Sequence, residues 1–115
     1  MAQHNDLGKK GEEQAINFLK DKNFTILETN YRHRRAEIDI IARKENTLHC
    51  IEVKTRSRID YGTPETFVSK AKIRLLIEAI NHYVDNNILD VDIQFDIISV
   101  YKENIEHIEH AFYHF

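Results

Sequence analysis

The sequence contains a single cysteine, three glycines and no apolar run near the roughly 18 residues that a membrane-spanning helix needs. One cysteine, Cys50, excludes an internal disulfide and a structural zinc site of the four-cysteine type. Neither a glycine-rich phosphate-binding loop nor a Ser-His-Asp nucleophile elbow is present. The first ten residues lack the apolar region of a signal peptide, so we expect a cytoplasmic protein with no membrane partner.

The 115 residues, of which 42% are hydrophobic and 30% charged, predict a single domain over 1–115 with one modest core. The net charge of −3 is unevenly distributed along the chain. Residues 1–74 carry 15 of the 16 Lys and Arg and 11 of the 19 Asp and Glu, a balance of +4, whereas residues 75–115 have a balance of −7. Such asymmetry is typical of a protein that binds a polyanion, although chance clustering of solvated charges gives the same pattern.

Two runs rich in Ile and Val between residues 37 and 54 are joined by the polar segment 43–47, which is typical of a β-hairpin. Because strand side chains alternate between faces, Ile38 and Ile40 are expected to share one face of the first strand. In the second strand, a thiol inside an apolar run is typical of a packed side chain, so we expect Cys50 to be buried rather than nucleophilic.

The same alternation gathers Asp39, Glu52 and Lys54 on one face of two adjacent strands. Acids and lysine are uncommon in strands, and their burial costs several kcal/mol unless they are paired or bind a metal. One interpretation is an edge hairpin with a solvated ion pair across the strands, which is worth about 1 kcal/mol or less. The other is a Mg²⁺ site, since Mg²⁺ takes carboxylate and carbonyl oxygens. Lys54 would then lie over a metal-bound water or a scissile phosphate.

Residues 5–22 predict an amphipathic helix, because apolar side chains recur at helical spacing. Glu12 falls along the apolar stripe of this helix. It is therefore either a residue at the rim of the stripe or a third carboxylate that reaches the polar face of the hairpin. Gly8 and Gly11 have no side chain and would let another part of the backbone approach the helix closely.

Basic side chains flank the hairpin and begin the next predicted helix. Arginine offers bidentate, permanently charged donors that suit phosphate, although short charged loops are often simply solvated. Cations in the first turns of a helix oppose the helix dipole, which indicates contact with an anion or, equally, plain solvation. The candidate phosphate contacts are Arg32, Arg34, Arg35, Arg56, Lys70 and Lys72.

Helical spacing predicts the longest helix at 69–87, with Ser69 as its N-terminal cap. His107 and His110 have HxxH spacing, which by itself is only a weak indication of a zinc site. The remaining predicted elements are strands at 24–31 and 91–101 (with a bulge near its end), a final strand or extended tail at 105–115, and a loop at 60–64.

These features occur in an order that resembles the PD-(D/E)xK nuclease superfamily: Glu12 on a helix, then Asp39, then Glu52-Val53-Lys54, then a long helix with Lys72 near its start. More closely, the chain resembles the small bacterial YraN-like proteins, which are akin to archaeal Holliday junction resolvases. The segments that carry this resemblance cover most of the chain: 8–20, 30–42, 48–57, 63–76 and 95–100.

The resemblance implies an α/β fold in which helices flank a mixed central sheet, as in restriction endonucleases. It implies Mg²⁺, with Mn²⁺ as the alternative ion, held by Asp39 and Glu52 with Glu12 joining them, and it implies that Lys54 is catalytic. The implied activity is hydrolysis of phosphodiester bonds in DNA, branched or junction DNA included. Enzymes that cut branches act through two coordinated sites, so a homodimer is expected by analogy.

Two other functions are compatible with the same residues. The chain could be a non-catalytic nucleic-acid-binding module that retains a nuclease fold, or a protein-interaction domain whose acidic C-terminal part binds a basic partner. The set of two acids and a lysine favours the enzyme over the binding module, because carboxylates that face a phosphate weaken binding unless a cation lies between them.

Overall fold

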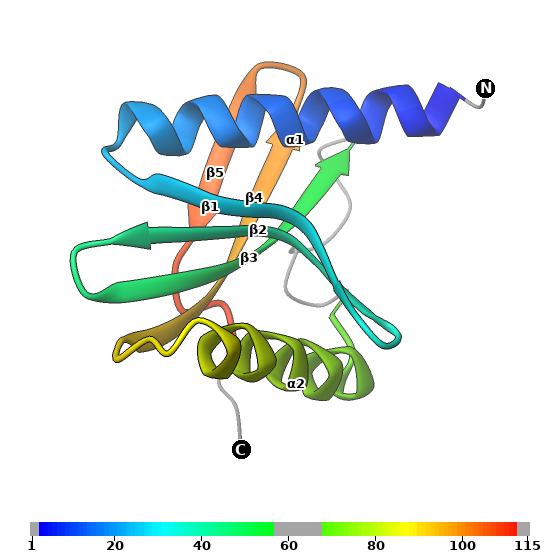
Figure 1. Cartoon of the computed structure of the whole chain (residues 1–115). Coiled ribbons are helices and arrows are strands. Elements are labelled where there is room, and N and C mark those ends of the chain that lie inside the picture. The colour runs from blue at the N-terminus through cyan, green and yellow to red at the C-terminus, as the bar shows by residue number, and fades with distance from the viewer. Residues whose placement is uncertain (1–2, 57–67, 113–115) are drawn as a thin grey trace.

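The structure, a computed structural model, describes residues 3–56 and 68–112 (Figure 1). This part of the chain forms, in order, α1 (Gln3–Asp21), β1 (Thr25–His33), β2 (Ala36–Lys44), β3 (Thr47–Arg56), α2 (Lys70–Asn86), β4 (Asp92–Tyr101) and β5 (Asn104–Ile108). The loop predicted at 60–64 lies outside the described residues. Neither of the described helices is long and apolar enough to cross a membrane.

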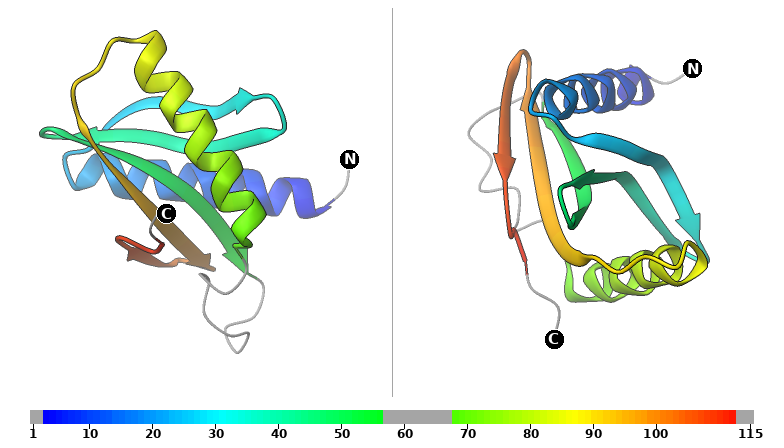
Figure 2. Two further views of the ribbon diagram at one scale, coloured as in Figure 1. Left: turned by 90° about the horizontal axis from the view of Figure 1, so that it is seen from below. Right: turned by 60° about the vertical axis from the view of Figure 1, so that its left-hand side comes forward.

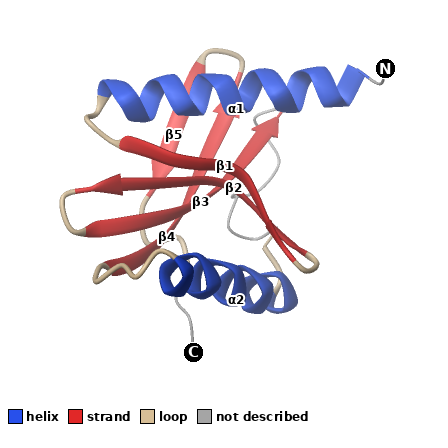
Figure 3. Cartoon of the chain, in the orientation of Figure 1, coloured by secondary structure: helices blue, strands red, loops and turns tan. Residues whose placement is uncertain are grey.

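The strands form one sheet in the order β1-β2-β3-β4-β5 (Figure 3). β3 and β4 are parallel, and the other three pairs are antiparallel, so the sheet is mixed. The parallel pair needs a crossover connection, and α2 lies within it. The predicted α/β fold with a mixed sheet is therefore confirmed, and this architecture is consistent with a nuclease-like fold. Because β3 is the central strand, the alternative of an edge hairpin is excluded.

One helix covers each face of the twisted sheet (Figure 2). Ala15 and Leu19 of α1 pack with Ile51 and neighbouring side chains on one face. Leu76 and Ile80 of α2 pack with a second cluster on the other face. Both helices present one apolar stripe to the sheet, so amphipathic spacing in the sequence places them correctly.

Most predicted elements occur within two residues of their predicted bounds, and Ser69 caps α2 by accepting a hydrogen bond from the Lys72 N–H (3.1 Å). Two predictions about strands were wrong. β4 pairs with β3 and β5 in continuous register, and the sheet has its irregularity in β1 instead, between Ile26 and Glu28. The sequence of β4 changes parity because its middle is buried on both faces. The last strand ends at Ile108, so residues 109–112 are not part of a strand, and residues 113–115 of the predicted strand or tail lie outside the described residues.

The prediction that Ile38 and Ile40 share a face was also wrong. Ile38 packs in the cluster beneath α2, whereas Ile40 packs in the cluster beneath α1. Pairing of β2 with β3 begins at Ile40, opposite Ile51, and runs only toward the hairpin turn. The residue between the two isoleucines, Asp39, is where β2 leaves β3, and the side-chain alternation changes at this point.

Candidate metal and phosphate site

The separation of β2 from β3 opens the sheet beside Asp39. Val53 of β3 has no backbone partner on β2 at this level, and its N–H donates instead to Asp39 Oδ2 at 2.8 Å. The carboxylate thus replaces a carbonyl in the strand ladder, which keeps a backbone donor satisfied. This contact fixes Asp39 against the middle of the Glu52-Val53-Lys54 segment, as the sequence-based hypothesis requires.

Glu52 lies on the central strand and only 6% of its surface is exposed. Its Oε2 atom accepts from Lys72 Nζ at 2.5 Å and lies 3.5 Å from Lys54 Nζ. Its Oε1 atom is buried and has no hydrogen-bond partner among the described residues. A buried carboxylate oxygen without a partner is costly, so this atom marks a position that a ligand can stabilise.

Glu12 approaches the same opening from α1. Asn30 Nδ2 donates to Glu12 Oε1 at 3.2 Å, and Asn30 has the left-handed backbone conformation (φ 53°) that asparagine tolerates better than most residues. The sequence analysis missed Asn30, because no motif distinguishes it from an ordinary strand residue. α1 comes this close because Gly11 faces Thr55, where a Cβ atom would clash. The approach expected at both glycines therefore occurs only at Gly11, and it is made by the Thr55 side chain rather than by backbone; Gly8 has nothing within 4 Å of the corresponding position.

A pocket of about 420 Å³ brings the predicted catalytic residues together. Glu12, Asp39, Glu52 and Lys54 all line it, with Gly8 and parts of α1 and β3 completing the wall. Three carboxylates and an amine therefore share one opening, although they come from three separate elements. Lining a common pocket is a necessary condition for a shared cation, and these side chains meet it.

The carboxylates also influence each other's protonation. Burial, followed by the charge of Glu52, raises the pKa of Asp39 from its ordinary value of 3.8 to about 7. Burial likewise raises the pKa of Glu12 above its usual range, and the charges of Glu37 and Glu52 add to the effect, although the hydrogen bond from Asn30 opposes it. Burial and mutual repulsion thus disfavour the charged forms of these carboxylates, and a divalent cation would favour them.

The donor set fits Mg²⁺ or Mn²⁺. Asp39, Glu52 and Glu12 offer only oxygen atoms, which are the ligands that hard divalent cations prefer. The unpartnered Glu52 Oε1 gives this assignment a specific atom. The sequence predicted Lys72 as a phosphate contact. In the structure its ammonium forms an ion pair with Glu52 and balances part of the carboxylate charge.

The other predicted phosphate contacts lie around the sheet rather than in the pocket. Arg34 and Arg35 are exposed in the turn between β1 and β2. Arg32 is exposed and lies 3.5 Å from Glu37. Arg56 is half-buried as the last residue of β3, and Lys70 is exposed as the first residue of α2. Their contact with phosphate stays a prediction.

A second polar cluster lies on the face of the sheet that α1 covers. The Asp96 carboxylate is fully buried, and its Oδ2 atom lies 2.6 Å from His49 Nδ1 and 2.8 Å from His107 Nε2. Burial alone would raise the pKa of Asp96, but hydrogen bonds from His107, His49 and Gln94 hold it below its usual range. Sequence reasoning missed this cluster, because its members are far apart in the chain and the HxxH spacing at His107 and His110 pointed to the wrong pair.

Comparison with known proteins places the chain in a family. Residues 11–100 match the family described as "Uncharacterised protein family UPF0102". The chain is 60% identical to a UPF0102 protein of Flavobacterium psychrophilum and 51% identical to one of Christiangramia forsetii, in both cases over the whole of each chain. It is 43% identical to a UPF0102 protein of Phocaeicola vulgatus, over 98% of this chain and 97% of that protein. The chain therefore belongs to the UPF0102 family.

Proposed function

We propose that this protein is a metal-dependent endonuclease of the PD-(D/E)xK type, which hydrolyses phosphodiester bonds in DNA, branched DNA included. The observation that carries the proposal is the unpartnered, buried Glu52 Oε1 in a pocket shared with Asp39, Glu12 and Lys54. A protein that only bound nucleic acid would gain nothing from three carboxylates in one pocket, because they repel phosphate.

Each side chain in the pocket has a role that follows from its contacts. Asp39 and Glu52 would hold Mg²⁺, and Glu12, oriented by Asn30, would bind the ion directly or through a water. A bound Mg²⁺ would neutralise charge on the phosphate and lower the pKa of a bound water. Lys54 lies beside Glu52 and would stabilise the negative charge that develops on the phosphate during hydrolysis.

Lys72 would orient Glu52, one of the metal ligands, rather than contact the reacting atoms. Its ammonium donates to Glu52 Oε2, and the buried Oε1 atom has no hydrogen-bond partner among the described residues. Arginines around the sheet would contact the DNA backbone and position it without reading its sequence. A homodimer would bring two such sites to a branched substrate.

Cleavage assays test this proposal directly. We expect cutting of linear, flapped or four-way DNA with Mg²⁺ or Mn²⁺, and none with EDTA. Asp39→Asn should abolish cutting, and Lys54→Met should reduce its rate by about 100-fold or more, since it removes a charge that acts on the transition state. Glu12→Gln should reduce the rate by roughly 10- to 100-fold, as loss of an outer metal partner does.

Glu13→Gln is the matched control, because Glu13 is the exposed neighbour of Glu12 on α1 and does not line the pocket. Circular dichroism of each variant checks that the fold is kept. Salt-sensitive DNA binding without any cutting, unchanged by Asp39→Asn, would show that the protein is a binding module and would refute the enzyme. Absence of DNA binding even at low salt would refute both.

A further inference from the structure

We propose that His49, Asp96 and His107 form a second metal site, for a transition-metal ion of the zinc class, separate from the Mg²⁺ pocket. One atom from each residue can act as a ligand, and these three atoms all lie within 4.8 Å of one another. The residues belong to three adjacent strands, β3, β4 and β5, so the sheet itself holds them in register. This inference does not depend on the proposed nuclease function.

The two carboxylate oxygens of Asp96 have different hydrogen-bond partners. Oδ1 accepts from Gln94 Nε2 at 2.9 Å and from the His110 N–H at 3.1 Å. Oδ2 faces His49 Nδ1 and His107 Nε2. A metal-binding carboxylate needs such an arrangement, in which outer hydrogen bonds orient one oxygen and leave the other for the ion. Each imidazole N–H donates to Oδ2 here, so the two protons lie between the same three atoms that a bound cation would join.

Small side-chain movements convert this hydrogen-bonded arrangement to a metal site. Zinc ligands lie about 2.0–2.2 Å from the ion, so two nitrogen or oxygen ligands are roughly 3.3 Å apart in tetrahedral geometry. The N···O distances here are 2.6 Å and 2.8 Å. We expect His107 to make most of the movement that lengthens these distances. It lies on β5 at the edge of the sheet, and its ring is more exposed than that of His49.

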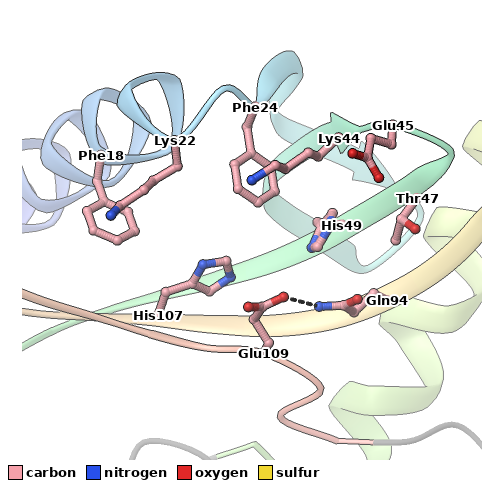
Figure 4. Close-up of a pocket in the computed structure, with 10 residues that line it drawn as sticks. All are labelled: Phe18, Lys22, Phe24, Lys44, Glu45, Thr47, His49, Gln94, His107 and Glu109. Atoms are coloured by element: carbon pink, nitrogen blue, oxygen red, sulfur yellow. Dashed lines mark hydrogen bonds between the residues drawn. The ribbon is translucent and has the colours of Figure 1, made fainter.

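The surroundings provide a fourth position and two aromatic rings that pack against the imidazoles. A pocket of about 410 Å³ opens beside both imidazoles (Figure 4). The Phe24 ring lies edge-on to His49, with ring centroids 4.8 Å apart, and Phe18 lies edge-on to His107 at 6.3 Å. Three protein ligands with one open position beside a pocket is the arrangement of zinc sites that bind a water or another small ligand.

The ligand chemistry separates this site from the carboxylate pocket. Imidazole nitrogens favour zinc, iron, nickel and copper, whereas sites made only of oxygens favour magnesium and manganese. His49 and Glu52 are three residues apart on β3, so they are about 10 Å apart along the strand and point to opposite faces. Excess Mg²⁺ should therefore occupy the carboxylate pocket without displacing zinc from the histidines.

Metal titration of the whole chain tests the proposal. After treatment with chelator, we expect one equivalent of Zn²⁺ to bind in the presence of excess Mg²⁺, as measured by calorimetry and by competition with a chromophoric chelator. Co²⁺ should give the intense visible bands of a low-coordinate site with nitrogen ligands. Bound Zn²⁺ should also raise the thermal midpoint of unfolding, because it binds only the folded chain.

His107→Gln is the informative variant, since glutamine can still donate a hydrogen bond to Asp96 but is a poor zinc ligand. It should weaken Zn²⁺ binding by at least about tenfold, because even the loss of a residue that only hydrogen-bonds to a metal ligand lowers metal affinity by that factor. His110→Gln is the matched control, because the exposed His110 side chain is not a member of the cluster and only its backbone N–H contacts Asp96. Asp39→Asn should bind Zn²⁺ as the wild type does.

Failure to bind Zn²⁺ in excess Mg²⁺ would overturn the proposal, as would equal binding by wild type, His107→Gln and His110→Gln, which would indicate adventitious surface binding only. If His107→Gln does not fold, the wild-type chain still gives an answer by nitrogen NMR of the histidine rings. Zn²⁺ should shift the ring signals of His49 and His107, and unchanged signals for both would overturn the proposal.

Discussion

At the scale of single residues, Glu52 and Asp39 are held by contacts to one carboxylate oxygen each. Lys72 and Lys54 lie against Oε2 of Glu52, and the Val53 N–H donates to Oδ2 of Asp39. These contacts orient the two carboxylates in the opening between β2 and β3. The result is a pocket in which two carboxylates have fixed orientations, which suits the binding of a divalent cation proposed above.

Asp39 makes the metal-free protein sensitive to pH. Its pKa is 3.8 in the ordinary state and about 7 in the folded chain, so the folded state binds the proton more tightly than the unfolded chain does. The stability that this group contributes is fully present below about pH 4 and is lost as the pH rises through about 7. Asp39→Asn cannot lose a proton, and its amide oxygen can still accept from Val53.

We therefore expect the wild type to lose more stability than Asp39→Asn between about pH 5 and pH 8, by roughly 1–3 kcal/mol. Chemical denaturation of the chelator-treated proteins across this range measures the difference, in which titrating groups remote from Asp39 cancel because both proteins share them. Added Mg²⁺ should reduce the wild-type loss. Parallel stability curves for the two proteins would contradict the raised pKa.

At the scale of elements, the close contact between α1 and the end of β3 depends on Gly11. A methyl group there would meet the Thr55 side chain, whereas one at Gly8 would meet nothing within 4 Å. In both positions alanine favours the helix by up to about 1 kcal/mol relative to glycine. The two substitutions are therefore matched in their effect on the helix and differ in the contact.

Gly11→Ala should lower the free energy of unfolding by about 1–3 kcal/mol, because overpacking outweighs the gain in helix propensity. Gly8→Ala should leave it unchanged or raise it slightly. Equilibrium unfolding in denaturant measures both, and Thr55→Ala should partly rescue Gly11→Ala by removing the atom nearest to the new methyl. Equal stability of the two alanine variants would show that the close approach is unimportant.

At the scale of the whole molecule, the mixed sheet keeps two groups of possible ligands apart. The carboxylates lie where the central strand β3 separates from β2, and the histidines lie on β3 and β5, on either side of β4. The balance of charge also differs between the two portions of the chain, with +4 in residues 1–74 and −7 in the rest. A polyanion should therefore bind through the N-terminal portion.

Salt dependence of DNA binding tests that prediction. The double variant Arg34→Ala, Arg35→Ala removes two exposed charges at the β1–β2 turn, and each lost phosphate contact should reduce the slope of log K against log salt by about 0.9 for duplex DNA. Fluorescence anisotropy at several salt concentrations gives the slope. Arg43→Ala is the control, since Arg43 lies toward the other end of β2 and bonds to Glu45 and Asn46. An equal effect of the control would show that no specific phosphate contact was lost.

Local signals in the sequence were enough to determine most elements. Helical spacing and the Ser69 cap located α2, and the apolar runs around 43–47 located the hairpin. The acid and lysine positions also identified the carboxylate site, because short-range spacing and the resemblance to a known family pointed to the same residues. The face to which each β2 side chain points was harder to predict. The alternation changes at Asp39, where β2 separates from β3 and the Asp39 carboxylate accepts a hydrogen bond from the Val53 N–H.

The sequence by itself determined the order of the elements and the amphipathic faces of the helices, because these depend on neighbours within a few positions, whereas the grouping of Glu12 with Asp39 and Glu52 was implied by the resemblance to a known family. Only the tertiary structure decided that Asn30 donates a hydrogen bond to Glu12, that Lys72 forms an ion pair with Glu52 and that two histidines contact Asp96. Those contacts join residues 11 to 47 positions apart in the chain. They depend on strand order and register, which no local pattern of side chains encodes.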